Sequence, residues 1–179
     1  SNIIQYLWNI PMILSTIVFA RSASAKDGYA FSLKVARLLR LSLLIIGGAA
    51  TIMAVFAYFI IVGMYGSEFV GSVDVLRILV PGVVLLTLFK VMNMDLAGKG
   101  KPWIAMKAMI PSLATNVALN VTLIPKLGAI GASWASTVSY SLAAVLFIYF
   151  YSRETGVRLK DIFRYAKEDF EPLRKLLKR

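Results

Sequence analysis

The feature of this chain that most constrains its fold is an apolar run from Val75 to Leu96. At a rise of about 1.5 Å per residue, a helix of this length crosses a hydrocarbon layer of about 30 Å. Similar runs recur along a chain that is 59% hydrophobic, against about 45–50% in ordinary soluble domains. The sequence therefore predicts an all-α, multi-pass transmembrane helical bundle. Its membrane-spanning helices, about five in number, are expected at residues 3–20, 41–64, 75–97, 102–124 and 129–151.

The composition changes near residue 152, which divides the chain into a transmembrane region, residues 1–152, and a basic tail, residues 153–179. In the tail, apolar residues recur at helical spacing among Lys and Arg, which indicates an amphipathic helix on the cytoplasmic membrane surface. Between the spans, residues 21–34 read as a loop, and the short segment 125–128 predicts a hairpin of the last two spans. The apolar tail residues are Leu159, Ile162, Phe163, Ala166, Phe170, Leu173 and Leu177.

The 20 Lys and Arg residues are distributed unevenly between the apolar runs. Counted along the sequence, five lie in residues 21–40, one at Arg77, four in residues 90–107, one at Lys126 and nine from Arg153 onward. The positive-inside rule then predicts a cytoplasmic tail and an N-terminus outside a cytoplasmic membrane. The net charge of +11 is explained by topology and by anionic lipid headgroups, without nucleic acid. A start on the outer side also leads us to expect upstream helices, so that the chain is a fragment of a longer protein.

Several polar residues fall inside or beside the predicted spans, where polar groups usually face protein or water. Their cations and amides suit an anionic or polyhydroxyl headgroup, which makes them candidates for the lining of a substrate cavity. An alternative for Lys90 is that it reaches the lipid headgroups, and Asp74 is placed to pair with Arg77. The candidate cavity residues are Arg77, Lys90, Asn93, Asn116 and Asn120.

Prolines and small residues mark two further features of the spans. Pro11, Pro81 and Pro111 are candidate helix kinks or hinges, because proline removes a backbone hydrogen bond. A stripe of small residues at four-residue spacing in the last span predicts close helix packing. This stripe consists of Gly131, Ala135, Ser139 and Ala143.

The residue types argue against an enzyme. The chain contains no Cys and no His, and we expect no metal and no cofactor. The loops hold no cluster of acidic residues for metal or base chemistry. The carboxylates Glu68, Asp74 and Asp95 lie near the ends of spans, so this part of the protein shows no obvious proton or sodium site.

Four sequence blocks stand in a fixed order: YGSEF (65–69), VLRILVPG (75–82), DLAGKGKP (95–102) and NVALNVTLIPKLGAIGASWASTVSY (116–140). Together they resemble the polysaccharide flippase family of the multidrug/oligosaccharidyl-lipid/polysaccharide exporter superfamily. The resemblance covers about residues 1–152 and the latter part of that family's C-terminal lobe. It implies an all-helical transporter of two lobes that moves a polyprenyl-pyrophosphate-linked oligosaccharide across the membrane by alternating access.

The resemblance also implies partners: a lipid-linked oligosaccharide substrate, and an N-terminal lobe of the same protein that this chain lacks. Because the family is described as having a cationic cavity, Arg77 and Lys90 become candidates to meet a pyrophosphate or acidic sugars. The alternatives are a peptidoglycan-precursor flippase or a cation-coupled multidrug exporter of the same superfamily. From a different class, a non-transporting membrane scaffold of a glycan-assembly complex would use the basic tail for binding.

Overall fold

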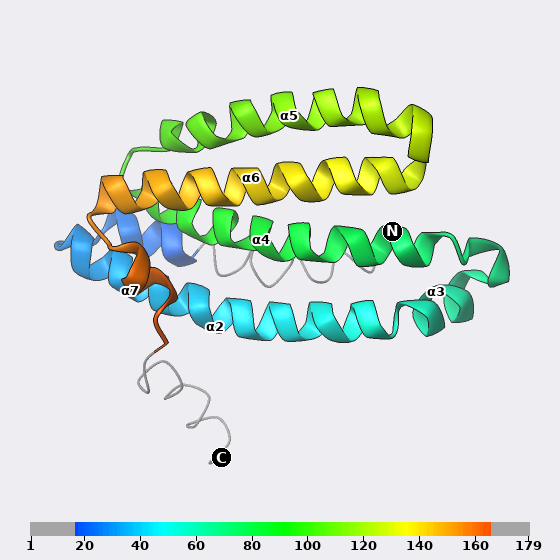
Figure 1. Cartoon of the computed structure of the whole chain (residues 1–179). Coiled ribbons are helices and arrows are strands. Elements are labelled where there is room, and N and C mark those ends of the chain that lie inside the picture. Colours follow the sequence, from blue (N-terminus) through cyan, green and yellow to red (C-terminus); the bar gives the residue numbers. More distant parts are fainter. Residues whose placement is uncertain (1–16, 166–179) are drawn as a thin grey trace, which may run out of the picture.

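The computed structural model describes residues 17–165, and all of their regular secondary structure is helical (Figure 1). Within the described residues, four helices are long and apolar enough to cross a membrane. This confirms the prediction of a multi-pass helical bundle, whereas most of the first predicted span, 3–20, lies outside the described residues. The elements are α2 (Gly28–Val55), α3 (Ala57–Tyr65), the 3₁₀-helix η1 (Ser67–Phe69), α4 (Ser72–Gly98), α5 (Trp103–Leu127), α6 (Ala129–Thr155) and α7 (Leu159–Phe163).

The four long helices lie side by side in the order α5, α6, α4, α2, with α6 packed between α5 and α4 (Figure 1). The hairpin of α5 and α6 is present as predicted, and only Gly128, at φ 57°, connects them. The main core lies where α2, α4 and α6 meet, near the end of the bundle that carries the connection from α4 to α5 and helix α7. This end is called the basic end below, because most of the Lys and Arg residues of the described part lie there. The largest fully buried side chains of the core include Leu39, Met92, Leu96, Phe147 and Tyr151.

Helix α2 begins much earlier than the predicted span 41–64. The Asp27 carboxylate caps it, accepting hydrogen bonds from the backbone N–H groups of Tyr29 and Ala30 at 3.0 and 3.1 Å. The interpretation of residues 21–34 as a loop is therefore wrong for most of that range. The Ala, Ser and Lys residues of this range are compatible with helix. Their polarity marks the end of the apolar stretch of α2 and not the end of the helix itself. The same predicted span also includes a bend at Phe56, where α2 gives way to α3.

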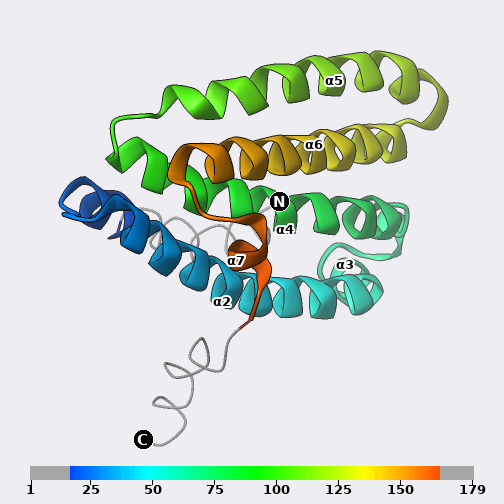
Figure 2. The ribbon, with the colours of Figure 1, turned by 60° about the vertical axis from the view of Figure 1, so that its left-hand side comes forward.

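The first part of the basic tail packs into the bundle instead of lying free on a surface. Helix α6 continues to Thr155, and the following segment crosses α2, where the Val157 and Ile162 side chains are fully buried (Figure 2). Arg40 holds this segment in place, since its Nη1 donates to the backbone carbonyl of Asp161 at 2.6 Å. Leu159 and Phe163 stay exposed; the other predicted apolar tail residues, Ala166, Phe170, Leu173 and Leu177, lie outside the described residues.

Two glycines allow helices to approach closely at sites that set the position of α4. A Cβ on Gly82 would lie 2.8 Å from the Cα of Thr137 on α6. At the other end of α4, a Cβ on Gly98 would lie 2.7 Å from both the carbonyl oxygen of Phe19 and the Cβ of Ser22. These two residues belong to segment 17–23, which is helical and precedes α2. Glycine at both positions therefore fixes how α6 and segment 17–23 meet α4.

We expect Gly98→Ala to lower the free energy of unfolding by about 1–3 kcal/mol, because the new methyl group meets backbone atoms that cannot move aside. The matched control is Gly48→Ala in α2, where a Cβ would meet nothing within 4 Å. This control is expected to raise stability by about 0.5–1 kcal/mol, since alanine favours helix. Thermal unfolding in detergent, followed by circular dichroism, measures both. Equal effects of the two substitutions would contradict the close approach at Gly98.

Candidate functional site

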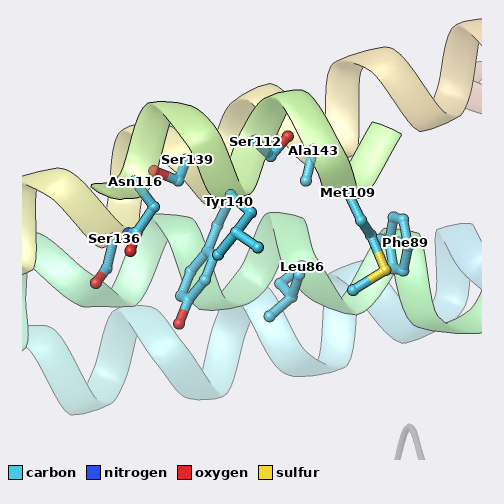
Figure 3. A pocket seen from close by; sticks show the side chains of 10 residues that line it. Leu86, Phe89, Met109, Ser112, Asn116, Ser136, Ser139, Tyr140 and Ala143 are labelled. Atoms are coloured by element: carbon cyan, nitrogen blue, oxygen red, sulfur yellow. The ribbon is translucent and has the colours of Figure 1, made fainter. Parts of the chain in front are cut away.

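A pocket of about 350 Å³ lies over α6, between α4 and α5 (Figure 3). It sits near the middle of these three helices, far from both of their ends. Figure 3 shows Phe89 and Met109 at one end of the pocket and Asn116 and Ser136 at the other. The lining residues are Leu86 and Phe89 of α4, Met109, Ser112, Leu113 and Asn116 of α5, and Ser136, Ser139, Tyr140 and Ala143 of α6.

Small side chains on α6 create the space for the pocket. Ser136, Ser139 and Ala143 form its floor, and two of them, Ser139 and Ala143, belong to the small-residue stripe. The Ser139 hydroxyl donates to the carbonyl of Ala135 at 2.6 Å, and the Ser112 hydroxyl donates to that of Ala108 at 2.7 Å. These serines are thus satisfied within their own helices, while their oxygens can still accept hydrogen bonds from a bound group.

The described residues that line the pocket carry no charge. They offer hydroxyl and amide groups from Ser, Tyr and Asn next to the apolar side chains of Leu86, Phe89, Met109 and Leu113. Such a lining matches a neutral group with many hydroxyls better than it matches a cation or an anion, because a charge here would remain uncompensated. The pocket's chemistry therefore favours the polyhydroxyl part of the predicted headgroup over its phosphate.

Two of the five candidate cavity residues lie at this pocket. Asn116 lines it, and Asn120 lies one turn further along α5. The Nδ2 of Asn120 donates to the Oδ1 of Asn116 at 2.9 Å, which orients the Asn116 amide. The spacing of these asparagines, i and i+4, places them on one face of the helix.

The other three candidates lie elsewhere on α4. Arg77 is exposed, and its Nε donates to the carbonyl of Ala54 at 3.1 Å, which joins the start of α4 to the end of α2. Lys90 and Asn93 are half-buried, and the Oδ1 of Asn93 is buried without a hydrogen-bond partner among the described residues. Lys90 follows the pocket residue Phe89 and therefore points about 100° away from it around the helix. The five candidates are thus not gathered in one pocket.

The candidate hinge and packing residues are placed as follows. Pro81 lies inside α4 and Pro111 inside α5, whereas Pro11 lies outside the described residues. One turn of α4 near Pro81 is held by α6, because the Thr137 hydroxyl donates to the carbonyl of Ile78 at 2.6 Å. All four stripe residues, Gly131, Ala135, Ser139 and Ala143, are buried, and a Cβ on Gly131 would lie 2.5 Å from the carbonyl oxygen of Leu123 in α5.

A buried carboxylate network at the basic end of the bundle was missed by the sequence analysis. The side chain of Asp95 is fully buried, and its Oδ1 accepts from the Ser22 hydroxyl at 2.6 Å. Its Oδ2 accepts from the Ser32 hydroxyl at 2.7 Å, the Tyr151 hydroxyl at 2.6 Å and the Lys99 ammonium at 3.0 Å. Lys99 also donates to the Ser32 hydroxyl and to the carbonyl of Gly28, the latter at 2.9 Å.

This network, hereafter the Asp95 network, consists of Asp95, Ser22, Ser32, Lys99 and Tyr151. It joins segment 17–23, α2, α4 and α6 at one point. The spacing of Asp95 and Lys99, four residues apart in DLAGKGKP, was a signal for their ion pair. The hydroxyl partners are 56 to 73 residues away in the sequence and gave no such signal.

Comparison with known proteins places these features in a family. The family model described as "Lipid II flippase MurJ" matches residues 9–171. Among curated proteins, the chain is 28% identical over 155 residues to "Uncharacterized membrane protein MJ1068" of Methanocaldococcus jannaschii, covering 85% of this chain and 30% of that protein. It is 29% identical over 104 residues to "Probable low-salt glycan biosynthesis flippase Agl15" of Haloferax volcanii, covering 58% of this chain and 21% of that protein.

The chain therefore spans less than a third of the length of these two relatives. No solved structure matches it significantly. The match to the family model nevertheless covers most of the chain and includes α2 to α7. On this evidence the chain is a multi-pass membrane protein that belongs to the lipid II flippase MurJ family.

Proposed function

We propose that this chain is part of a flippase that moves a polyprenyl-pyrophosphate-linked oligosaccharide across the cytoplasmic membrane for the synthesis of cell-surface polysaccharide. The observation that carries this proposal is the uncharged, hydroxyl- and amide-lined pocket near the middle of three membrane-length helices. A sugar that crosses the hydrocarbon layer loses its hydrogen bonds to water and needs replacements at this depth. Asn116, Tyr140 and the pocket serines offer such replacements.

The charged part of the substrate requires a different set of residues. We assign the pyrophosphate to Arg77 and Lys90, which lie in the first and last thirds of α4 and so at different depths in the membrane. In this proposal, the lobe described here faces an N-terminal lobe of the same protein, and the substrate passes between the two by alternating access. The protein acts as a transporter of the exporter superfamily and not as an enzyme. Asn93, with its unpaired carbonyl oxygen, is a further candidate for contact with the substrate.

A peptidoglycan precursor is the second candidate substrate, and the observation that favours it is the name of the matching family, lipid II flippase. A lipid-linked oligosaccharide is favoured by the printed name of the relative from Haloferax volcanii, a glycan biosynthesis flippase. Both substrates are sugars linked to lipid, so the pocket suits either. A cation-coupled exporter fits less well, because the buried carboxylate of Asp95 is already bonded by four donors.

Asn116→Leu is expected to reduce glycan export at least about tenfold, because it removes hydrogen bonds from the pocket while keeping the size of the side chain. Export is measured as surface glycan in a strain that lacks the gene and carries the full-length variant, with membrane abundance followed by immunoblot. Thr122→Val is the matched control, since Thr122 lies on α5 outside the pocket and is exposed. Normal export by the Asn116→Leu variant would contradict the proposed site.

The double variant Arg77→Ala/Lys90→Ala is expected to lose most glycan export while its membrane abundance stays normal, because the pyrophosphate charge loses its partners. Lys126→Ala serves as the control for the loss of a cation, as Lys126 is exposed at the end of α5. The same surface-glycan assay applies. Unchanged export in the double variant would remove both residues from the mechanism.

The proposed orientation can be tested by labelling introduced thiols, because residues 1–179 contain no cysteine. A cysteine at the exposed position Ser67, in η1, is expected to react with an impermeant maleimide in intact cells. A cysteine at the exposed position Lys160, in α7, should react only after the membrane is permeabilised. This pattern is expected because Lys and Arg are in excess at the α7 end of the bundle, and segments rich in Lys and Arg stay on the cytoplasmic side of the membrane. The opposite labelling pattern would invert the proposed topology.

A further inference from the structure

We propose that Asp95 and Tyr151 are positioning residues of the transporter. From the basic end of the bundle, they hold in place the Phe89 side chain that forms one end of the pocket, hereafter the Phe89 wall. The inference concerns the shape of the same pocket. Only its relevance to transport rests on the proposed function. The supporting features of the structure are the Asp95 network, three packed aromatic rings and the contact of α4 with segment 17–23.

The Asp95 network fixes the end of α6 against α4. Both carboxylate oxygens of Asp95 are engaged, and the Tyr151 hydroxyl approaches Oδ2 at 2.6 Å. Hydrogen bonds to a charged group are short and directional, and here all of the donors converge on a side chain that water does not reach. The position of the Tyr151 ring is therefore set by a bond at its tip as well as by the packing around it.

A series of aromatic contacts leads from Tyr151 to the pocket. The ring centroids of Tyr151 and Phe147 are 6.4 Å apart, and those of Phe147 and Phe89 are 4.5 Å apart. Tyr151 and Phe147 are fully buried, and Phe89 is 7% exposed. In an interior packed this closely, a ring cannot shift without displacing its neighbour. Because Phe89 forms one end of the pocket, the Tyr151 hydroxyl bond helps to determine the shape of that end (Figure 3).

The same network connects the pocket to segment 17–23. Ser22 bonds Asp95 directly, and Gly98 lets the backbone of this segment approach within contact distance of α4. A displacement of segment 17–23 would therefore pull on Asp95 first and on Phe89 through the rings. In an alternating-access transporter, such a connection relates the position of segment 17–23 to the shape of the substrate pocket.

The test uses the reactivity of one thiol inside the pocket. Ser112 lines the pocket and is 5% exposed, so a Ser112→Cys thiol should react slowly with N-ethylmaleimide in the full-length protein in membranes. Adding Tyr151→Phe, which deletes only the hydroxyl, is expected to raise the labelling rate at least about threefold as the Phe89 wall relaxes. Tyr149→Phe is the matched control: Tyr149 lies on the same helix, but is exposed, and its hydroxyl accepts only a 3.4 Å hydrogen bond from Arg153.

A reference thiol separates a specific effect from general loosening. Ser42→Cys places a buried thiol in α2, outside the pocket, and its labelling should not change with Tyr151→Phe. Asp95→Asn is a second variant, expected to raise Ser112→Cys labelling further if the protein folds. Equal labelling with and without Tyr151→Phe, or a parallel rise at Ser42→Cys or with Tyr149→Phe, would overturn the proposal. Because labelling requires no substrate, this outcome is independent of the Asn116→Leu export test.

Discussion

The fold depends on one constraint, which is that hydrocarbon offers no partner for a backbone N–H or carbonyl group. Each long helix satisfies these groups internally, and several hydroxyl side chains do the same by donating to the carbonyl four residues earlier. Ser42, Thr87, Ser112 and Ser139 all show this bond, at 2.6 to 3.1 Å. Within the described part of the chain, polar side chains meet one another or a cavity at two places in particular, the Asp95 network and the pocket over α6.

The two polar centres of the structure solve opposite problems. The Asp95 network brings donors to a buried charge and leaves no space between them, so it stabilises one arrangement of four segments. The pocket instead has small side chains and hydroxyl oxygens around an open volume, which no helix of residues 17–165 fills. A carboxylate at membrane depth is costly unless paired, whereas serine and asparagine at that depth are tolerated. The buried charge of Asp95 therefore serves packing, whereas the neutral polar groups of the pocket stay open to a further contact.

The sequence predicted those features that depend on local patterns. Apolar run lengths located α4, α5 and α6 closely, and the short segment 125–128 correctly predicted the hairpin of α5 and α6. The start of α2 was missed because Lys34, Arg37 and Arg40 interrupt the apolar run without interrupting the helix. The pocket could not be predicted, because its lining comes from three helices and depends on which way each side chain points. Phe89 lines the pocket, whereas its neighbour Lys90 points about 100° away from it around the helix. The hydroxyl partners of Asp95 come from distant segments, which only the packed structure brings together.

The attachment of the segment after α6 has a consequence for how the bundle sits in lipid. Arg40 draws the carbonyls of Asp161 and Ile162 onto α2, so the exposed cations Arg158, Lys160 and Arg164 belong to a segment that is bonded to α2. Anionic headgroups that bind these cations therefore act on the bundle through α2. The membrane surface is thereby linked to a helix whose Arg40 lies 121 residues before Asp161 in the sequence.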